Sequence, residues 1–176
     1  MLIVASAFWV MLPAYVPNSA AAAVGGGISI DGGRCWTDGR RILGDGKTFR
    51  GFIGGVLCGC FIGGLQIIAQ SNPFFSSLPV LSPLVVLLLA TGALVGDMVK
   101  SFFKRRAGID RGGKWPVVDQ YDFVAGAFVF LLIGNPTFAF STLSLPVIIA
   151  ILIITPVLHR VVNIIGYKLG VKDVPW

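Results

Sequence analysis

The sequence contains no glutamate and little charge of either sign. Only 12% of its 176 residues are charged, and all eight acidic residues are aspartates. A soluble domain of this length needs a polar surface, so the composition excludes an ordinary soluble globular protein. Because glutamate is the better helix former, the aspartates are better explained as caps, turns or ligands than as solubilising residues.

Cysteine and histidine are also scarce. The chain has three cysteines, two of them (Cys58 and Cys60) within an apolar stretch, and one histidine, His159. An odd number of cysteines in this placement does not predict a disulfide framework or a zinc site, so we expect free thiols. The lone histidine ends the last apolar stretch, and we assign it no catalytic role.

Charge is missing altogether from long parts of a chain whose mean hydropathy is +0.85. The uncharged stretches are residues 1–30, 51–96 and 123–158. Every charged residue falls in one of three islands, residues 31–50, 97–122 and 160–173. A helix needs about 20 apolar residues to cross a bilayer core, so this pattern predicts an all-α integral membrane protein in the cell membrane.

The uncharged stretches have room for about five transmembrane helices. The expected spans are Leu2–Val24, Phe52–Gln70, Leu78–Gly96, Phe123–Phe140 and Leu145–Ile165, with a kink at Gly134-Asn135-Pro136. All three islands then lie on one side, and each has more basic than acidic residues. Positive loops stay inside, which places the N-terminus outside and the C-terminus in the cytoplasm.

We expect a single membrane-embedded domain over residues 1–176, with two functional cytoplasmic loops at about 25–51 and 97–122. Residues 1–24 could instead be a cleaved signal peptide. The start has no basic residues, and cleavage would leave the island 31–50 translocated against its excess of lysine and arginine, so we favour a span.

The first loop combines glycines with basic residues and ends in Gly46-Lys47-Thr48, followed by Arg50. Glycine lets backbone N–H groups approach phosphate oxygens, and the basic side chains add charge. The segment is similar to the end of a P-loop, but Arg41 stands where that motif has its first glycine, and no strand precedes it. From these residues alone, a flexible loop that binds anionic lipid heads is an equally good interpretation.

The second island places several polar residues on one helix face. Asp97, Lys100, Ser101 and Lys104 are spaced i, i+3, i+4 and i+7. Further cations follow at Arg105, Arg106 and Lys114. This face would continue from the third span to the membrane surface.

Three carboxylates are expected at about the same membrane depth, because Asp119 and Asp122 open the fourth span and Asp97 ends the third. Together they could hold Mg²⁺, and the neighbouring cations could bind the phosphate charge. The alternative is that each aspartate caps a helix or pairs with a lysine. The number of cations at this membrane mouth favours a site.

Glycine recurs every fourth residue along the second span, at Gly51, Gly55, Gly59 and Gly63. Such a small-residue face predicts close helix packing. A groove for a lipid chain beside that face is the alternative.

At Ser101-Phe102-Phe103-Lys104-Arg105 and Asp119-Gln120-Tyr121-Asp122 the chain resembles the CDP-diacylglycerol synthase superfamily, whose signature runs S-x-x-K-R, a spacer, then D-R-x-D. Gln120 replaces the bacterial arginine, and the histidine–glycine–glycine run before that motif is missing. These departures suit the archaeal branch, the CDP-archaeol synthases. Other segments that resemble this branch are Gly25–Gly33, Gly39–Thr48, Gly96-Asp97, Trp115-Pro116 and Gly170–Trp176.

The resemblance implies a CTP-dependent cytidylyltransferase that converts 2,3-di-O-geranylgeranylglycerol 1-phosphate to CDP-archaeol and pyrophosphate. It implies Mg²⁺ as the cofactor, with Asp97, Asp119 and Asp122 as its ligands, and we take Lys104 and Asp119 as the catalytic candidates. The substrate-binding candidates are Gly46, Lys47, Thr48, Arg50, Lys100, Ser101, Arg105, Arg106 and Lys114. The expected partners are CTP, an isoprenoid ether lipid phosphate and the membrane, without nucleic acid, and a homodimer is left open.

Two other functions stay open at this point. One is a nucleotide-dependent lipid-alcohol kinase of the same superfamily, whose acceptor is a hydroxyl. The other is a transporter or scaffold whose basic loops bind anionic lipid. No ionisable group lies in the middle of a predicted span to mark a permeation path, which disfavours a transporter.

Overall fold

The computed structural model describes residues 2–110 and 112–170, which are mostly helical. Their elements are α1 (Leu2–Val24), α2 (Phe49–Ala69), the 3-10 helix η1 (Pro73–Phe75), α3 (Pro83–Arg106), α4 (Val118–Gly134), α5 (Pro136–Thr142) and α6 (Leu145–Lys168). Four helices, α1, α2, α3 and α6, are long and apolar enough to cross a membrane. The prediction of an all-α, multi-pass membrane protein is therefore confirmed.

The fourth predicted span is divided. α4 has 17 residues, fewer than the about 20 that cross a bilayer core, and the chain turns at Asn135 before Pro136 starts α5. The Asn135 side chain accepts a hydrogen bond from the N–H of Phe138 at 3.1 Å and so caps α5. The predicted kink is confirmed, whereas a fifth span stays a prediction. The closing residues 171–176 of the resemblance lie outside the described residues.

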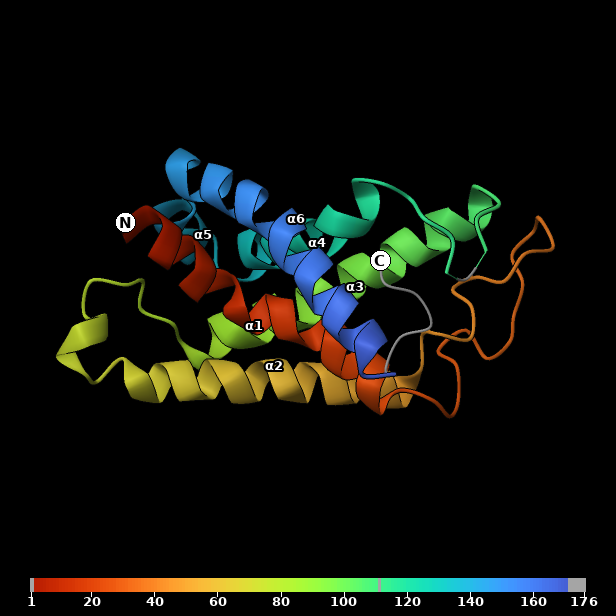
Figure 1. Ribbon diagram of the computed structural model, residues 1–176, viewed down its shortest axis with the longest axis horizontal. Coiled ribbons are helices and arrows are strands. Elements are labelled where there is room, and N and C mark those ends of the chain that lie inside the picture. Colours follow the sequence, from red (N-terminus) through yellow and green to blue (C-terminus); the bar gives the residue numbers. More distant parts are fainter. Residues whose placement is uncertain (1, 111, 171–176) are drawn as a thin grey trace.

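The charged loops gather at one end of an elongated helix bundle (Figure 1). The loop between α1 and α2 and the connection between α3 and α4 lie at this end, while the N-terminus and the connection between α2 and α3 lie at the other. α1 packs against α2, α3 and α6, and α4 packs against α3. Val10, Leu89, Leu131 and Ile151, one from each of α1, α3, α4 and α6, are fully buried in the core between these helices.

Two prolines inside spans explain two long-range polar contacts. Proline has no N–H, so it leaves the carbonyl four residues earlier without its helical partner, and an unpaired polar group is costly in lipid. Pro13 deprives Trp9 O of its helical donor, and the Gln66 amide of α2 donates a hydrogen bond to this oxygen instead, at 2.8 Å. Pro156 does the same to Leu152 O, which accepts a hydrogen bond from the Tyr121 hydroxyl of α4, also at 2.8 Å.

Glycines set the distance between neighbouring helices. The four glycines of the α2 stripe, Gly51 to Gly63, are all buried, as the close-packing prediction requires. A Cβ added at Gly59 would lie 2.7 Å from the Ala90 Cβ and 2.8 Å from the Pro13 oxygen. On the other side of α3, a Cβ at Gly96 would collide with the carbonyl of Asp122. This backbone contact between α3 and α4 brings Asp122 beside the charged face of α3.

Candidate active site

The first loop, residues 25–48, folds around the buried carboxylate of Asp31. This carboxylate accepts hydrogen bonds from the N–H groups of Leu43 at 3.0 Å and Gly44 at 2.8 Å, and it pairs with Arg41 at 2.7 Å. Burial opposes the charge, but these bonds, led by that from Arg41, hold the pKa of Asp31 well below its usual range. Asp31 thus orders the segment that leads to Lys47.

A pair of arginines fastens this loop to the end of α3. Arg40 donates to the carbonyl oxygens of Arg105 at 3.1 Å and Arg106 at 3.3 Å. Arg106 donates back to the carbonyls of Arg40 and Arg41, at 3.0 and 2.7 Å, and pairs with Asp38 at 2.7 Å. We call Arg40, Arg106 and Asp38 the arginine clasp. It supplies partners for the last carbonyls of α3, which no helical N–H can reach.

Lys100 lies where three carboxylates meet. Its Nζ is 2.9 Å from Asp97, 2.7 Å from Asp122 and 3.5 Å from Asp119. Asp97 and Lys100 are one turn apart on α3, and the glycine contact described above supplies the two aspartates of α4. The convergence that the sequence predicted for these carboxylates is therefore present, with an ammonium group at its centre.

Two further lysines complete this cluster, one before and one after Lys100 in the sequence. Lys47, at the end of the first loop, pairs with Asp97, and Lys104, one turn beyond Lys100, binds both oxygens of Asp119 at 2.9 and 3.0 Å. Each of these ion pairs is at least half buried. We call these six residues, Lys47, Lys100, Lys104, Asp97, Asp119 and Asp122, the lysine–aspartate cluster.

Asp119 does not cap α4, contrary to the simplest structural interpretation of its position. The N-cap of α4 is Val117, which makes no side-chain capping bond and has φ +69°, a left-handed conformation that is rare for a β-branched residue. Asp119 instead accepts from the N–H of Trp115 at 2.7 Å and binds Lys104. Its carboxylate thus bridges the segment just before α4 and Lys104 of α3.

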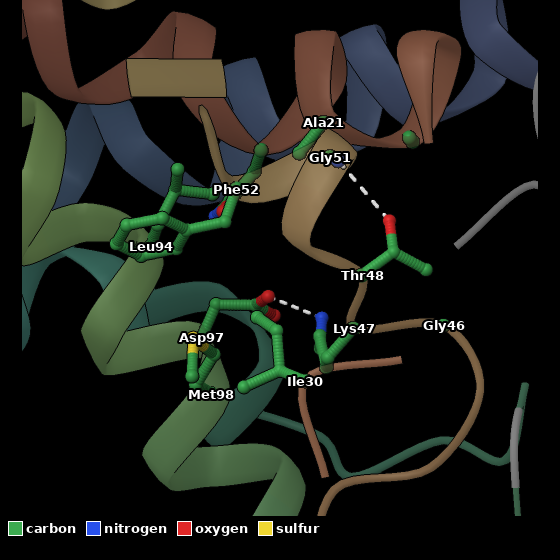
Figure 2. A pocket seen from close by; sticks show the side chains of 12 residues that line it. Ala21, Ile30, Gly46, Lys47, Thr48, Gly51, Phe52, Leu94, Asp97 and Met98 are labelled. Atoms are coloured by element: carbon green, nitrogen blue, oxygen red, sulfur yellow. Dashed lines mark hydrogen bonds and ion pairs between the residues drawn. The ribbon is translucent and has the colours of Figure 1, made fainter. Parts of the chain in front are cut away.

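A pocket opens beside the pair of Lys47 and Asp97, between α1, α2 and α3 (Figure 2). Its polar wall includes Gly46, Lys47, Thr48 and Asp97. Its apolar wall comes from the three helices and from Ile30 of the first loop. The helical residues of this wall are Ala21, Ala22, Phe52, Leu94 and Met98, with Gly51 between them. A polar wall beside an apolar one suits a molecule that has a phosphate at one end and an apolar group at the other.

Asn18 of α1 also lines this pocket and was missed by the sequence analysis. Its Oδ1 atom is buried and has no hydrogen-bond partner within the described residues. The available signal was an amide side chain near that end of α1 which leads into the first charged loop, in a span that otherwise has almost no polar residues. Because Asn18 carries no charge, an analysis based on charged islands passed over it.

The carboxylates of the cluster are of the donor type that binds Mg²⁺, but they are not spaced around a common metal position. Within residues 2–110 and 112–170, no three aspartate, cysteine or histidine side chains are already spaced to hold one metal ion. The donor type nevertheless fits, because Mg²⁺ prefers carboxylate oxygens. In addition, Asp122 Oδ1 is buried with no hydrogen-bond partner in the described part of the chain. Metal binding by Asp97, Asp119 and Asp122 stays a prediction.

The other predicted site residues lie outside the lysine–aspartate cluster. Thr48 caps α2 by accepting from the N–H of Gly51 at 3.1 Å, and Ser101 donates to Asp97 O at 2.9 Å. Arg50 binds the carbonyl of Val24, the last residue of α1, and that of Gly25, the residue after it. The remaining three candidates are Arg105, which donates to Ile109 O at 2.7 Å, Arg106 in the clasp, and Lys114 in the connection between α3 and α4. Their contacts with substrate stay predictions.

The three cysteines are free, as expected, and Cys35 is exposed.

Residue Gly108, with φ +74°, follows the end of α3 and takes the left-handed conformation that glycine adopts most easily. It allows the chain to leave α3 next to Arg40 of the clasp.

Comparisons with known proteins agree on one family. The CDP-archaeol synthase family matches residues 1–176. The CDP-archaeol synthases of Methanospirillum hungatei JF-1 and Methanosphaerula palustris are 59% and 60% identical, over 94% of this chain and 100% of each relative. A solved structure of an intramembrane enzyme for archaeal membrane lipids biosynthesis matches with a TM-score of 0.66 at 35% identity, over 85% of this chain and 90% of that chain. This chain therefore belongs to the CDP-archaeol synthase family.

Proposed function

We propose that the lysine–aspartate cluster is the site where this chain transfers the cytidylyl group of CTP to an isoprenoid ether lipid phosphate. The observation that supports this most strongly is the meeting of three lysines and three aspartates, from the first loop, α3 and α4, beside a half-apolar pocket. Membership of the family favours cytidylyl transfer over the lipid-alcohol kinase and the scaffold considered above.

The proposed reaction joins two phosphate groups. A phosphate oxygen of 2,3-di-O-geranylgeranylglycerol 1-phosphate attacks the α-phosphorus of CTP and forms a new P–O bond. The bond from the α-phosphorus to the oxygen that bridges it to the β-phosphate breaks, and pyrophosphate leaves with that electron pair. The attacking phosphate monoester is already ionised near neutral pH, so no histidine or serine base is needed.

In such a reaction the protein mainly positions and neutralises phosphates. Lys47 reaches the cluster from the loop and Lys104 from α3, so two phosphate-bearing substrates can be bound from different sides. Lys104 is the candidate for stabilising charge on the transferred phosphorus, and Asp119 holds its ammonium in place. When bound at the aspartates, Mg²⁺ would neutralise charge on the triphosphate.

We also propose five transmembrane segments, with the break between α4 and α5 inside the fourth. The cluster then lies at the cytoplasmic mouth, where CTP arrives from solvent and the lipid from the leaflet. Exposed Cys35 supports a direct test of this arrangement. In sealed right-side-out vesicles an impermeant maleimide should label a cysteine introduced at the N-terminus but not Cys35. Labelling of Cys35 before permeabilisation would contradict the topology.

CTP labelled at one phosphate at a time tests the reaction itself. Label on the α-phosphate should enter the lipid fraction only when lipid phosphate is added. Label on the γ-phosphate should appear in pyrophosphate and leave the lipid unlabelled. A lipid labelled from the γ position, formed from an alcohol acceptor, would identify a kinase and refute the proposal.

A further inference from the structure

Lys100 differs from the other two lysines of the cluster in the number of carboxylates that it contacts. Its Nζ lies within 3.5 Å of all three aspartates, and its side chain is only 13% exposed. In the described part of the chain, Lys47 pairs with Asp97 alone and Lys104 with Asp119 alone. The Lys100 ammonium therefore occupies the single position where the three carboxylates converge.

We propose that Lys100 is a built-in substitute for the divalent cation. In the metal-free enzyme its ammonium holds the three carboxylates together, and it gives up this position to the metal when the nucleotide enters. The released ammonium then pairs with a phosphate of the same nucleotide. This inference rests on the proposed function, because it assumes that the three aspartates are the metal ligands.

The charge balance of the cluster gives this exchange a consequence. Three lysines face three aspartates, so the cluster is neutral before any ligand binds. A divalent cation that binds alone would displace Lys100 and leave two uncompensated positive charges in a half-buried site, which is costly. A cation that arrives with a triphosphate brings negative charge for Lys100 to bind. Metal and nucleotide should therefore bind together and the metal should bind poorly alone.

The alternative is that Lys100 forms a permanent structural ion pair. Buried ion pairs of this kind are common, and loss of one partner destabilises the fold because the other charge is left unpaired. The two interpretations differ in what Mn²⁺, used in place of Mg²⁺, does to a protein that lacks Lys100. A vacated cation position should bind Mn²⁺, whereas a broken structural pair should not.

The experiment measures Mn²⁺ binding to the full chain in lipid nanodiscs, without nucleotide, from the EPR signal of free Mn²⁺. Lys100→Met should bind Mn²⁺ at least about tenfold more tightly than the wild type. Lys104→Met is the matched control, because it removes the same charge from the same cluster but contacts only Asp119. Its Mn²⁺ affinity should change by much less.

Stability provides a second measurement should Lys100→Met fold poorly. A variant that is unstable without metal but becomes monodisperse and melts at a higher temperature with Mn²⁺ supports the proposal. A variant whose stability Mn²⁺ does not restore overturns the proposal. Lys100→Gln, which keeps a polar side chain without the charge, should give the same result as Lys100→Met.

The design separates the two levels of the argument. If Asp122→Asn, introduced into the Lys100→Met protein, leaves Mn²⁺ binding unchanged, the aspartates are not the ligands and the proposed metal site fails. If Asp122→Asn abolishes binding but Lys100→Met and Lys104→Met raise the affinity equally, the metal site stands. In that case the metal affinity depends only on the net charge of the cluster, and the proposal that Lys100 takes the place of the divalent cation is refuted.

Discussion

The lysine–aspartate cluster and the arginine clasp lie at the same charged end of the molecule, but their cations have different partners. The three lysines of the cluster pair with carboxylates. The arginines of the clasp, and Arg50 nearby, donate mainly to main-chain carbonyl oxygens. The sequence presents all of them as one basic surface, and the structure separates them into lysines that pair with carboxylates and arginines that bind main-chain carbonyls.

The chemistry of the two side chains explains this division. A guanidinium is a planar fork that can bind two carbonyl oxygens at once, which suits the carbonyls at the ends of α1 and α3 that have no helical partner. An ammonium is a compact charge on a flexible stem and can exchange one oxygen partner for another with little change of geometry. Lysine is thus suited to a site where carboxylates and phosphates compete for the same cation.

The largest difference between the regions should appear in turnover after loss of one cation. Lys47→Met removes a direct phosphate ligand in our account, so turnover should fall by about 100-fold or more. The melting temperature should change little, because Asp97 keeps its ion pair with Lys100. Arg50→Met is the matched control, because Arg50 lies only three residues further along the chain but donates to the main-chain carbonyls of Val24 and Gly25. Its turnover should fall less than about tenfold, measured as incorporation of α-labelled CTP into lipid.

Equal losses of turnover in these two variants would contradict the division between the regions. They would indicate that Arg50, which the sequence analysis also took as a substrate ligand, contacts phosphate directly.

A smaller effect, mainly on stability, is expected in the clasp. Arg106→Ala removes two hydrogen bonds to the first loop and the pair with Asp38, so the free energy of unfolding should fall by about 2 kcal/mol. Arg106→Lys keeps the charge but not the fork, and should recover less than half of that loss. Thermal unfolding in detergent measures both, and full recovery by lysine would show that charge alone matters.

The sequence could predict part of the lysine–aspartate cluster but not the arginine clasp. The spacing of Asp97, Lys100 and Lys104 fixes their common helix face, because an α-helix repeats every 3.6 residues. The approach of Asp122 depends on the contact at Gly96, which no local pattern reveals. The clasp was not predictable, because its acceptors are main-chain carbonyls whose position depends on how the loop folds.

The fold shows the same limit. α1 was predicted to the residue because a charge-free run defines it, and the break at Asn135 follows from the proline after it. The pairing of Gln66 with Trp9 needed the relative positions of α1 and α2. Likewise, Asn18 became visible as a pocket residue only when the three helices around it were placed.

The smallest effect is expected at acidic pH, in the first loop. Because the pKa of Asp31 in the folded chain lies well below that of a free aspartate, its charge stabilises the fold above about pH 4, the ordinary value. This contribution falls as the pH drops below that value toward the folded pKa. The melting temperatures of wild type and Asp31→Asn should differ by a constant amount from pH 8 to 5 and converge below pH 4. A gap independent of pH would exclude the charge as its cause.

The most direct test of the central claim is the activity of Asp119→Asn and Asp122→Asn across a range of Mg²⁺ concentrations. Each change keeps the size of the side chain and removes one carboxylate from the cluster. The account predicts that both proteins extract and elute like the wild type but turn over at least about 100-fold more slowly, with any residual activity shifted to higher Mg²⁺. Near-normal turnover by both variants at ordinary Mg²⁺ would contradict it and would place the reaction outside the lysine–aspartate cluster.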